Sequence, residues 1–159
     1  MIHEVIVTTF NKKKEVHIAP MGVKLIDFDN NQCVQISPFK PSQTLNNLID
    51  TKVATINYVD NVKVFAGIVT GEKKSWDLNQ VSDSCVPHLD ITNTYMNVSV
   101  CQENDDDVRP NIICNIENTK ILDTTYKANN TTHSSVTIRP KETRALLITG
   151  TNTAVVIKI

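Results

Sequence analysis

Short runs in which β-branched and other apolar residues alternate with polar ones dominate the chain. Such alternation is typical of strands that bury one face, and polar turns separate the runs. The sequence predicts strands at residues 2–10, 16–26, 32–37, 52–60, 95–102, 111–122, 136–138, 145–149 and 154–159. This pattern constrains the fold more than any other feature, and it indicates a mainly β barrel with one or two short helices.

Two of the connections have no clear strand pattern. The apolar run at 62–69 fits either a short helix or a strand, because a run of this length does not distinguish the two. Residues 70–90 contain Gly71, Pro87 and many polar side chains, and we expect a long connection with one turn of helix at most. Residues 123–135 are rich in Thr and Asn and predict a loop.

The composition sets broad limits on the kind of protein. With 159 residues, 40% of them hydrophobic, the chain is expected to form a single domain, residues 1–159. A formal net charge of −1 offers no electrostatic basis for binding nucleic acid. No stretch approaches the roughly 18 apolar residues of a membrane span, and no signal peptide begins the chain. Four widely spaced cysteines favour free thiols in a reducing cytoplasm.

The second predicted strand carries an unusual block, Ala19-Pro-Met-Gly22. Pro20 removes a backbone donor, and Gly22 permits an unusual dihedral or the close approach of another group. We therefore expect the strand to be interrupted there, at a bulge or a barrel corner. His17 alternates in step with Ala19 and Met21, so these three should share one face of the strand. His17 is then either a partly exposed surface histidine or a ligand contact.

The stretch Ser37–Leu48 joins a strand to a short helix. Two prolines force an extended turn, after which Ser42 or Thr44 can cap the helix. The backbone amides at Gln43 and Thr44 would then point outward from a helix N-terminus, which attracts anions and phosphate above all. Lys40 adds a positive charge beside it. The alternative is an ordinary capped loop.

The sequence contains none of the motifs that mark common catalytic or metal sites. The four histidines are scattered, and there is no H-E-x-x-H and no paired Cys/His spacing, so no metal site is expected. There is also no G-x-S-x-G, no P-loop and no G-x-G-x-x-G. The residues alone assign no catalytic acid or base.

Several blocks, taken in order, resemble one known family. They are His3-Glu-Val-Ile-Val-Thr-Thr9, Val16-His-Ile-Ala-Pro-Met-Gly-Val23, Ser37-Pro-Phe39, Gln43-Thr44, Asn47-Leu48, Ile56-Asn-Tyr-Val-Asp60, Val64-Phe-Ala66, Pro87-His-Leu89 and the acidic turn before Arg109-Pro110. Together they resemble an uncharacterised domain-of-unknown-function family of archaea and methylotrophic bacteria. That family is placed in the FMN-binding split-barrel superfamily, alongside flavin reductase-like and pyridoxamine-phosphate-oxidase-like proteins. The resemblance covers about residues 1–118 and leaves 119–159 uncovered.

The resemblance implies a Greek-key-like split β-barrel that forms a homodimer with FMN at the subunit interface. It implies phosphate contacts at Ser42, Gln43 and Thr44, where the anion argument places them. It implies flavin-ring contacts along one strand, at His17, Ala19, Pro20, Met21 and Gly22. A polar edge would be completed by Asn47, Asn57 and Asp60.

The chain departs from this family in two places. Ser37 stands where the family usually has Arg before Pro-Phe, and a bidentate Arg–phosphate pair is hard to replace. The end of the chain lacks the helical segment that the family carries. Three functions stay open: an FMN-binding flavoprotein that acts as a flavin-dependent oxidoreductase, a split-barrel binding or structural dimer that has lost flavin, and a barrel that binds a deazaflavin or a pterin.

Overall fold

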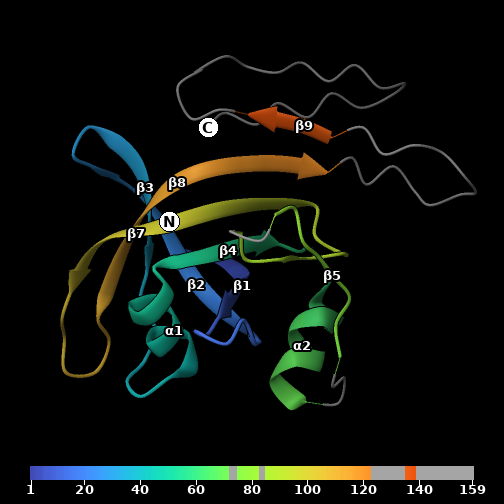
Figure 1. The fold of residues 1–159 in the computed structure, drawn as a ribbon, viewed down its shortest axis with the longest axis horizontal. Coiled ribbons are helices and arrows are strands. Elements are labelled where there is room, and N and C mark those ends of the chain that lie inside the picture. The colour runs from blue at the N-terminus through green and yellow to red at the C-terminus, as the bar shows by residue number, and fades with distance from the viewer. Residues whose placement is uncertain (72–74, 83–84, 123–134, 139–159) are drawn as a thin grey trace, which may run out of the picture.

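The computed structural model describes residues 1–71, 75–82, 85–122 and 135–138 (Figure 1). The strands are β1 His3–Phe10, β2 Val16–Phe28, β3 Asn31–Ile36, β4 Val53–Tyr58, β5 Leu78–Asn79, β6 His88–Leu89, β7 Thr94–Asn104, β8 Asn111–Leu122 and β9 Ser135–Ile138. The helices are α1 Gln43–Thr51 and α2 Val62–Thr70. The strands predicted at 145–149 and 154–159 lie outside the described residues. Within those residues, no helix has the length and apolar character needed to cross a membrane.

One antiparallel sheet forms the body of the molecule. Its strand order is β3-β2-β1-β4-β7-β8-β9, and it closes on itself because β3 also pairs with β8. The strand β8 pairs with two strands along the same edge, with β3 through residues 112–115 and with β9 through residues 119–122. Figure 1 shows β7 and β8 running across the upper part of the molecule with both helices below them, and the turn between β7 and β8 reaching down beside α1. The predicted mainly β barrel with two short helices is confirmed.

The strand β2 changes its partner in the middle of its length. Residues 16–23 pair with β1 and residues 23–28 pair with β3, so that Val23 belongs to both ladders. Among the described residues, no strand pairs with the second edge of residues 16–22. The barrel is therefore open along this half of β2.

The predicted interruption of β2 is wrong. The register with β1 runs without a shift through Pro20, which lies opposite Ile6. A strand with one free edge tolerates proline, because the missing amide is needed only where a partner strand waits to accept it. Gly22 has no positive φ. The group that approaches it closely is Ile2, whose Cγ2 would lie 2.9 Å from a Cβ built on Gly22.

The two helices begin and end at recognisable capping residues. The first, α1, starts after Ser42 and ends at Lys52 in the left-handed conformation, a few residues beyond the predicted Leu48. The ambiguous run at 62–69 is the helix α2. Its N-cap is Asn61, whose side chain accepts a hydrogen bond from the Lys63 amide, and Gly71 closes its C-terminus at φ 68°.

Each helix covers a different apolar cluster of the sheet. Leu45 and Leu48 of α1 pack into the main core, which contains Val5 and Val7 of β1. The intervening residue of β1, Ile6, belongs instead to a second cluster with residues of α2 and β6. Successive strand residues point to opposite faces, so one face of β1 and β2 meets α1 and the other meets α2.

The connection at 71–90 contains paired strands in place of the predicted helical turn. In its described part, Leu78 lies opposite Leu89 and Asn79 lies opposite His88. Trp76 packs against the second cluster, as expected for the one bulky side chain of this stretch. Strands of two residues are too short to produce a visible alternation, so the sequence pattern could not reveal them.

A buried polar network attaches residues 86–89 to the sheet. Asn57 is fully buried, and its Nδ2 donates to the Ile6 carbonyl at 3.0 Å and to Thr8 Oγ1 at 3.2 Å. Its Oδ1 accepts from the Leu89 amide at 2.8 Å. Thr8 Oγ1 donates to the Pro87 carbonyl at 2.7 Å. The network therefore satisfies the buried backbone groups of a segment that has little secondary structure of its own.

We expect Asn57→Ala to lower the free energy of unfolding by about 2–3 kcal/mol, because it leaves the Leu89 amide and the Ile6 carbonyl buried without this partner. Urea denaturation followed by circular dichroism measures the change. The matched control is Asn46→Ala on the exposed side of α1, which should change stability by less than about 0.5 kcal/mol. Equal stability of the two variants would contradict the structural role of Asn57.

Candidate functional site

The N-terminus of α1 presents free backbone donors. Ser42 has an extended conformation, and its Oγ accepts from the Leu45 amide at 3.3 Å. Within the described residues, the amides of Gln43 and Thr44 have no hydrogen-bond acceptor. The first turn carries no acidic side chain. These donors and the helix dipole together favour an anion at this end of the helix.

Lys40 does not supply a free charge to this helix end. Its Nζ forms an ion pair with Asp105 of the turn between β7 and β8, and its backbone amide donates to the Val108 carbonyl at 2.9 Å. The hydrogen bond from Lys40 is the main reason why the pKa of the Asp105 carboxyl lies below its usual value. The contribution of Lys40 to anion binding is therefore weakened by a carboxylate already in place.

The predicted shared face on β2 is confirmed by the register. His17, Ala19 and Met21 lie opposite Thr9, Val7 and Val5 of β1, respectively, and Met21 packs against the main core. All three side chains are partly exposed. Burial lowers the pKa of His17 from its ordinary value, because it disfavours the charged imidazolium.

The helix α1 and this face of β2 meet at one residue, Thr9. Asn47 of α1 is buried, and its Nδ2 donates to Thr9 Oγ1 at 3.0 Å. Thr9 is also the register partner of His17. The structure thus brings the middle of α1 and the predicted ring strand to a single threonine, although 30 positions separate His17 from Asn47 in sequence.

Four predicted site residues lie away from this group. Gly22, which lies opposite Glu4, is on the same face of β2 as Pro20. Pro20 and Asn57 are both register partners of Ile6, and they therefore share the sheet face that packs on α2. Asn57 already uses its amide oxygen and nitrogen in the buried network. Asp60 is exposed beside the N-cap of α2. The polar edge expected from Asn47, Asn57 and Asp60 is thus divided between two faces of the sheet.

The sequence does not single out Arg109 as a site residue, although the structure places it beside Ser37. The Arg109 Nε donates to the Ser37 carbonyl at 2.9 Å, across 72 positions of sequence. The guanidinium lies over the Phe39 ring, 4.4 Å from its centroid. Only the pairing of β8 with β3 reveals this proximity, so no local sequence signal could have found it.

Comparisons with known proteins identify the fold and the family. The solved structures similar to this chain include a flavoredoxin from Methanosarcina acetivorans, with a TM-score of 0.64, 14% identity and coverage of 91% of this chain and 89% of the other. A 2-nitrobenzoate 2-nitroreductase from Pseudomonas fluorescens has a TM-score of 0.64 and 16% identity, covering 94% and 85%. An FMN-binding protein from Thermus thermophilus has a TM-score of 0.62 and 8% identity, covering 73% and 68%.

Identities this low show a shared fold and no more. The search of curated proteins finds no match. The family model described as the N-terminal domain of a protein of unknown function, DUF447, matches residues 3–123. This match covers most of the chain and agrees with the resemblance drawn from the sequence blocks. The chain therefore belongs to the DUF447 N-terminal-domain family, and its fold is that of the FMN-binding split barrels.

Proposed function

We propose that this protein binds FMN, with the phosphate at the N-terminus of α1 and the flavin ring along residues 17–22 of β2. The observation that carries this proposal is the meeting of α1 and β2 at Thr9. Asn47 lies about one helical turn beyond the free amides of Gln43 and Thr44. The helix that carries the anion-attracting end therefore packs on the partly exposed strand face, and an FMN molecule needs both within one ligand length. The family match and the shared fold support a flavin cofactor.

The helix end suits the phosphate because its donors are backbone amides. The amides of Gln43 and Thr44 are held in place by the helix itself, so they need no reorganisation to bind an anion. A charge-assisted hydrogen bond is about twice as strong as a neutral one. Ser42, Gln43 and Thr44 are therefore the proposed phosphate contacts, and Lys40 a secondary one.

The open half of β2 suits a planar ring. Ala19 and Gly22 are small, and Pro20 presents no amide that would lose a partner. The second edge of residues 16–22 keeps its backbone donors and acceptors free of any described strand. Such an edge can bind the polar rim of a ring or pair with another chain.

The chemistry assigned to this chain is binding and orientation. A bound flavin supplies electron transfer, which makes a flavin-dependent oxidoreductase the proposed enzyme class. No side chain of the protein is assigned as acid or base. Cys33, Cys85, Cys101 and Cys114 are free thiols, which supports a place in a reducing cytoplasm.

One observation favours a second candidate, a split-barrel binding protein that does not hold flavin. Ser37 supplies no guanidinium, and the Lys40 charge is already paired with Asp105. Phosphate binding at the N-terminus of α1 would then depend on backbone donors alone. The preference for FMN over riboflavin distinguishes the two candidates, because riboflavin has the same ring without the phosphate.

We expect FMN to bind about 10-fold more tightly than riboflavin, the lower end of the range for one charge-assisted contact. Thr44 is buried at the helix end. In our proposal its hydroxyl contacts the phosphate, so Thr44→Val should reduce this ratio by a factor of about 5, a cost near 1 kcal/mol. Isothermal titration calorimetry measures both affinities. The matched control, Thr51→Val at the opposite end of α1, should leave the ratio unchanged. Equal binding of FMN and riboflavin by the unaltered protein would exclude the phosphate site at α1.

The imidazole of His17 reports on the ring position. We expect its NMR titration midpoint to lie below 6.5 in the free protein, because burial lowers its pKa. Riboflavin or FMN stacked along β2 would exclude more water and lower the midpoint further. His17→Gln assigns the signal, and His88, which is buried against Tyr95 with ring centroids 4.0 Å apart, serves as the internal reference. A His17 signal that does not respond to saturating flavin would place the ring elsewhere.

The free edge of β2 also supports the proposed homodimer, because unpaired strand edges attract a second chain unless something covers them. We expect light scattering at micromolar concentration to give twice the chain mass of 17.8 kDa. Because the proposed FMN lies at the subunit interface beside this edge and contacts both chains, flavin should shift the equilibrium further toward the dimer. A mass of one chain, with and without FMN, would contradict the proposal.

A further inference from the structure

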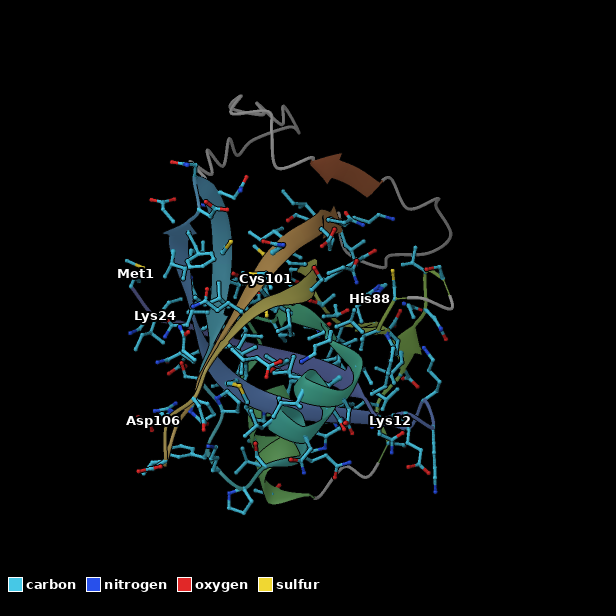
Figure 2. All side chains as sticks on the ribbon, turned by 60° about the vertical axis from the view of Figure 1, so that its left-hand side comes forward. Met1, Lys12, Lys24, His88, Cys101 and Asp106 are labelled. Carbon is cyan, nitrogen blue, oxygen red and sulfur yellow. The ribbon has the colours of Figure 1, made fainter. Side chains whose placement is uncertain are left out.

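A pocket of about 230 Å³ opens on the outside of the barrel where β2 leaves β1 for β3. Gly22, Ile2 and Lys24 line one side of it. Lys24 lies opposite Gln35 in the β2–β3 ladder. The neighbouring pair of the ladder, Val23 and Ile36, points into the core. The pocket is therefore on the opposite sheet face from the His17 side chain. Figure 2 shows Lys24 and Met1 on the same side of the molecule, with the turn that carries Asp106 below them.

Hydrogen bonds join the polar side chains on the floor of the pocket to one another, while Gln35 Oε1 has no partner among the described residues. Gln35 Nε2 donates to Asn111 Oδ1 at 2.8 Å and to Ser37 Oγ at 3.2 Å. Ser37 Oγ donates to the same Asn111 Oδ1 at 2.7 Å. Asn111 Nδ2 has no acceptor among the described residues. The floor thus offers a ligand the amide donor of Asn111, whereas Asn111 Oδ1 already accepts two hydrogen bonds.

Two contacts fix the Arg109 side chain at the rim, and the Arg109 backbone amide donates to Asp106 Oδ1 at 2.7 Å. Its Nε is bonded to the Ser37 carbonyl and its guanidinium stacks on Phe39. Within the described part of the chain, its terminal Nη groups have no acceptor and it forms no ion pair. A planar guanidinium held in this way presents a preorganised pair of donors, which matches the geometry of a carboxylate or phosphate.

Lys24 is the second cation of the pocket without a described partner. Lys12, Lys40 and Lys52 each form an ion pair with a carboxylate, whereas Lys24 forms none with any described residue. Two carboxylates lie near these cations: Glu4 is opposite Gly22 in the ladder, and Asp106 Oδ1 accepts from the Arg109 amide at 2.7 Å. Among the described residues, neither forms an ion pair with Lys24 or Arg109. The pocket thus combines two unpaired positive charges with an amide donor.

We propose that this pocket binds an anionic oxygen group, a phosphate, sulfate or carboxylate, between Arg109 and Lys24, with Asn111 as a third donor. The ligand is either a free small anion or the anionic end of a larger molecule. The proposal does not rest on flavin binding, since every residue that carries it differs from the contacts proposed at α1. Gly22, which has no side chain, and Ser37, which has a small one, leave space for the anion.

Calorimetric titration of the full chain with inorganic phosphate at low ionic strength tests this site. We expect Arg109→Gln to weaken phosphate binding by about 10- to 150-fold, the range for a charge-assisted contact, and Lys24→Gln to weaken it to a smaller extent. The matched control is Lys13→Gln, an exposed lysine of the β1–β2 turn, which should have no effect. The Lys24 side chain makes no hydrogen bond to a described residue, so Lys24→Gln keeps its fold even if Arg109→Gln loosens the turn.

The two sources of the anion are distinguished by titrating the same variants with FMN and riboflavin. A loss of FMN affinity without loss of riboflavin affinity means that the pocket holds the phosphate of a flavin. Unchanged FMN affinity together with weaker phosphate binding means that it holds a free anion, and Thr44→Val then leaves phosphate binding intact. The proposal is overturned if both variants bind phosphate and FMN with the affinity of Lys13→Gln.

Discussion

The change of partner within β2 is the constraint on which the other features of the molecule depend. Because β2 pairs with β1 before Val23 and with β3 after it, the barrel closes at one end and stays open at the other. The open half exposes the face that carries His17 and Met21. The junction itself creates the outer pocket at Gly22. Both proposed binding regions lie beside this change of partner, and a turn completes each of them: residues 37–42 before α1 in one, and the β7–β8 turn that carries Arg109 in the other.

The buried polar network holds the connection before β7 against the other face of the sheet. Asn57 and Thr8 hold a nearly structureless segment in place through backbone bonds, and α2 packs beside it. A buried amide with both ends bonded has little left to offer a ligand. Polar residues close together in sequence therefore have different surroundings: Asn57 is fixed inside by the network, while Asp60 is exposed.

The sequence pattern predicted most of the barrel because its strands either alternate apolar and polar residues, as in β7, or form a run of β-branched residues buried on both faces, as in β1. It could not decide on α2, whose apolar residues occupy a run too short for a period to appear. Pro20 suggested a broken strand, because the pattern does not show that one edge of β2 has no partner. The position of Arg109 beside Ser37 could not be predicted for a similar reason. It reaches Ser37 through the β3–β8 pairing, and spatial contacts between distant segments leave no trace in the spacing of residues.

The visible absorption spectrum of freshly purified protein tests the proposed flavin binding most directly. We expect the band of oxidised flavin, either as purified or after the protein is mixed with FMN and passed through a desalting column. A colourless protein that retains no added FMN would contradict a flavin-binding function and favour a binding dimer without cofactor. A band at shorter wavelength would contradict FMN in another way, because it would indicate a deazaflavin or a pterin.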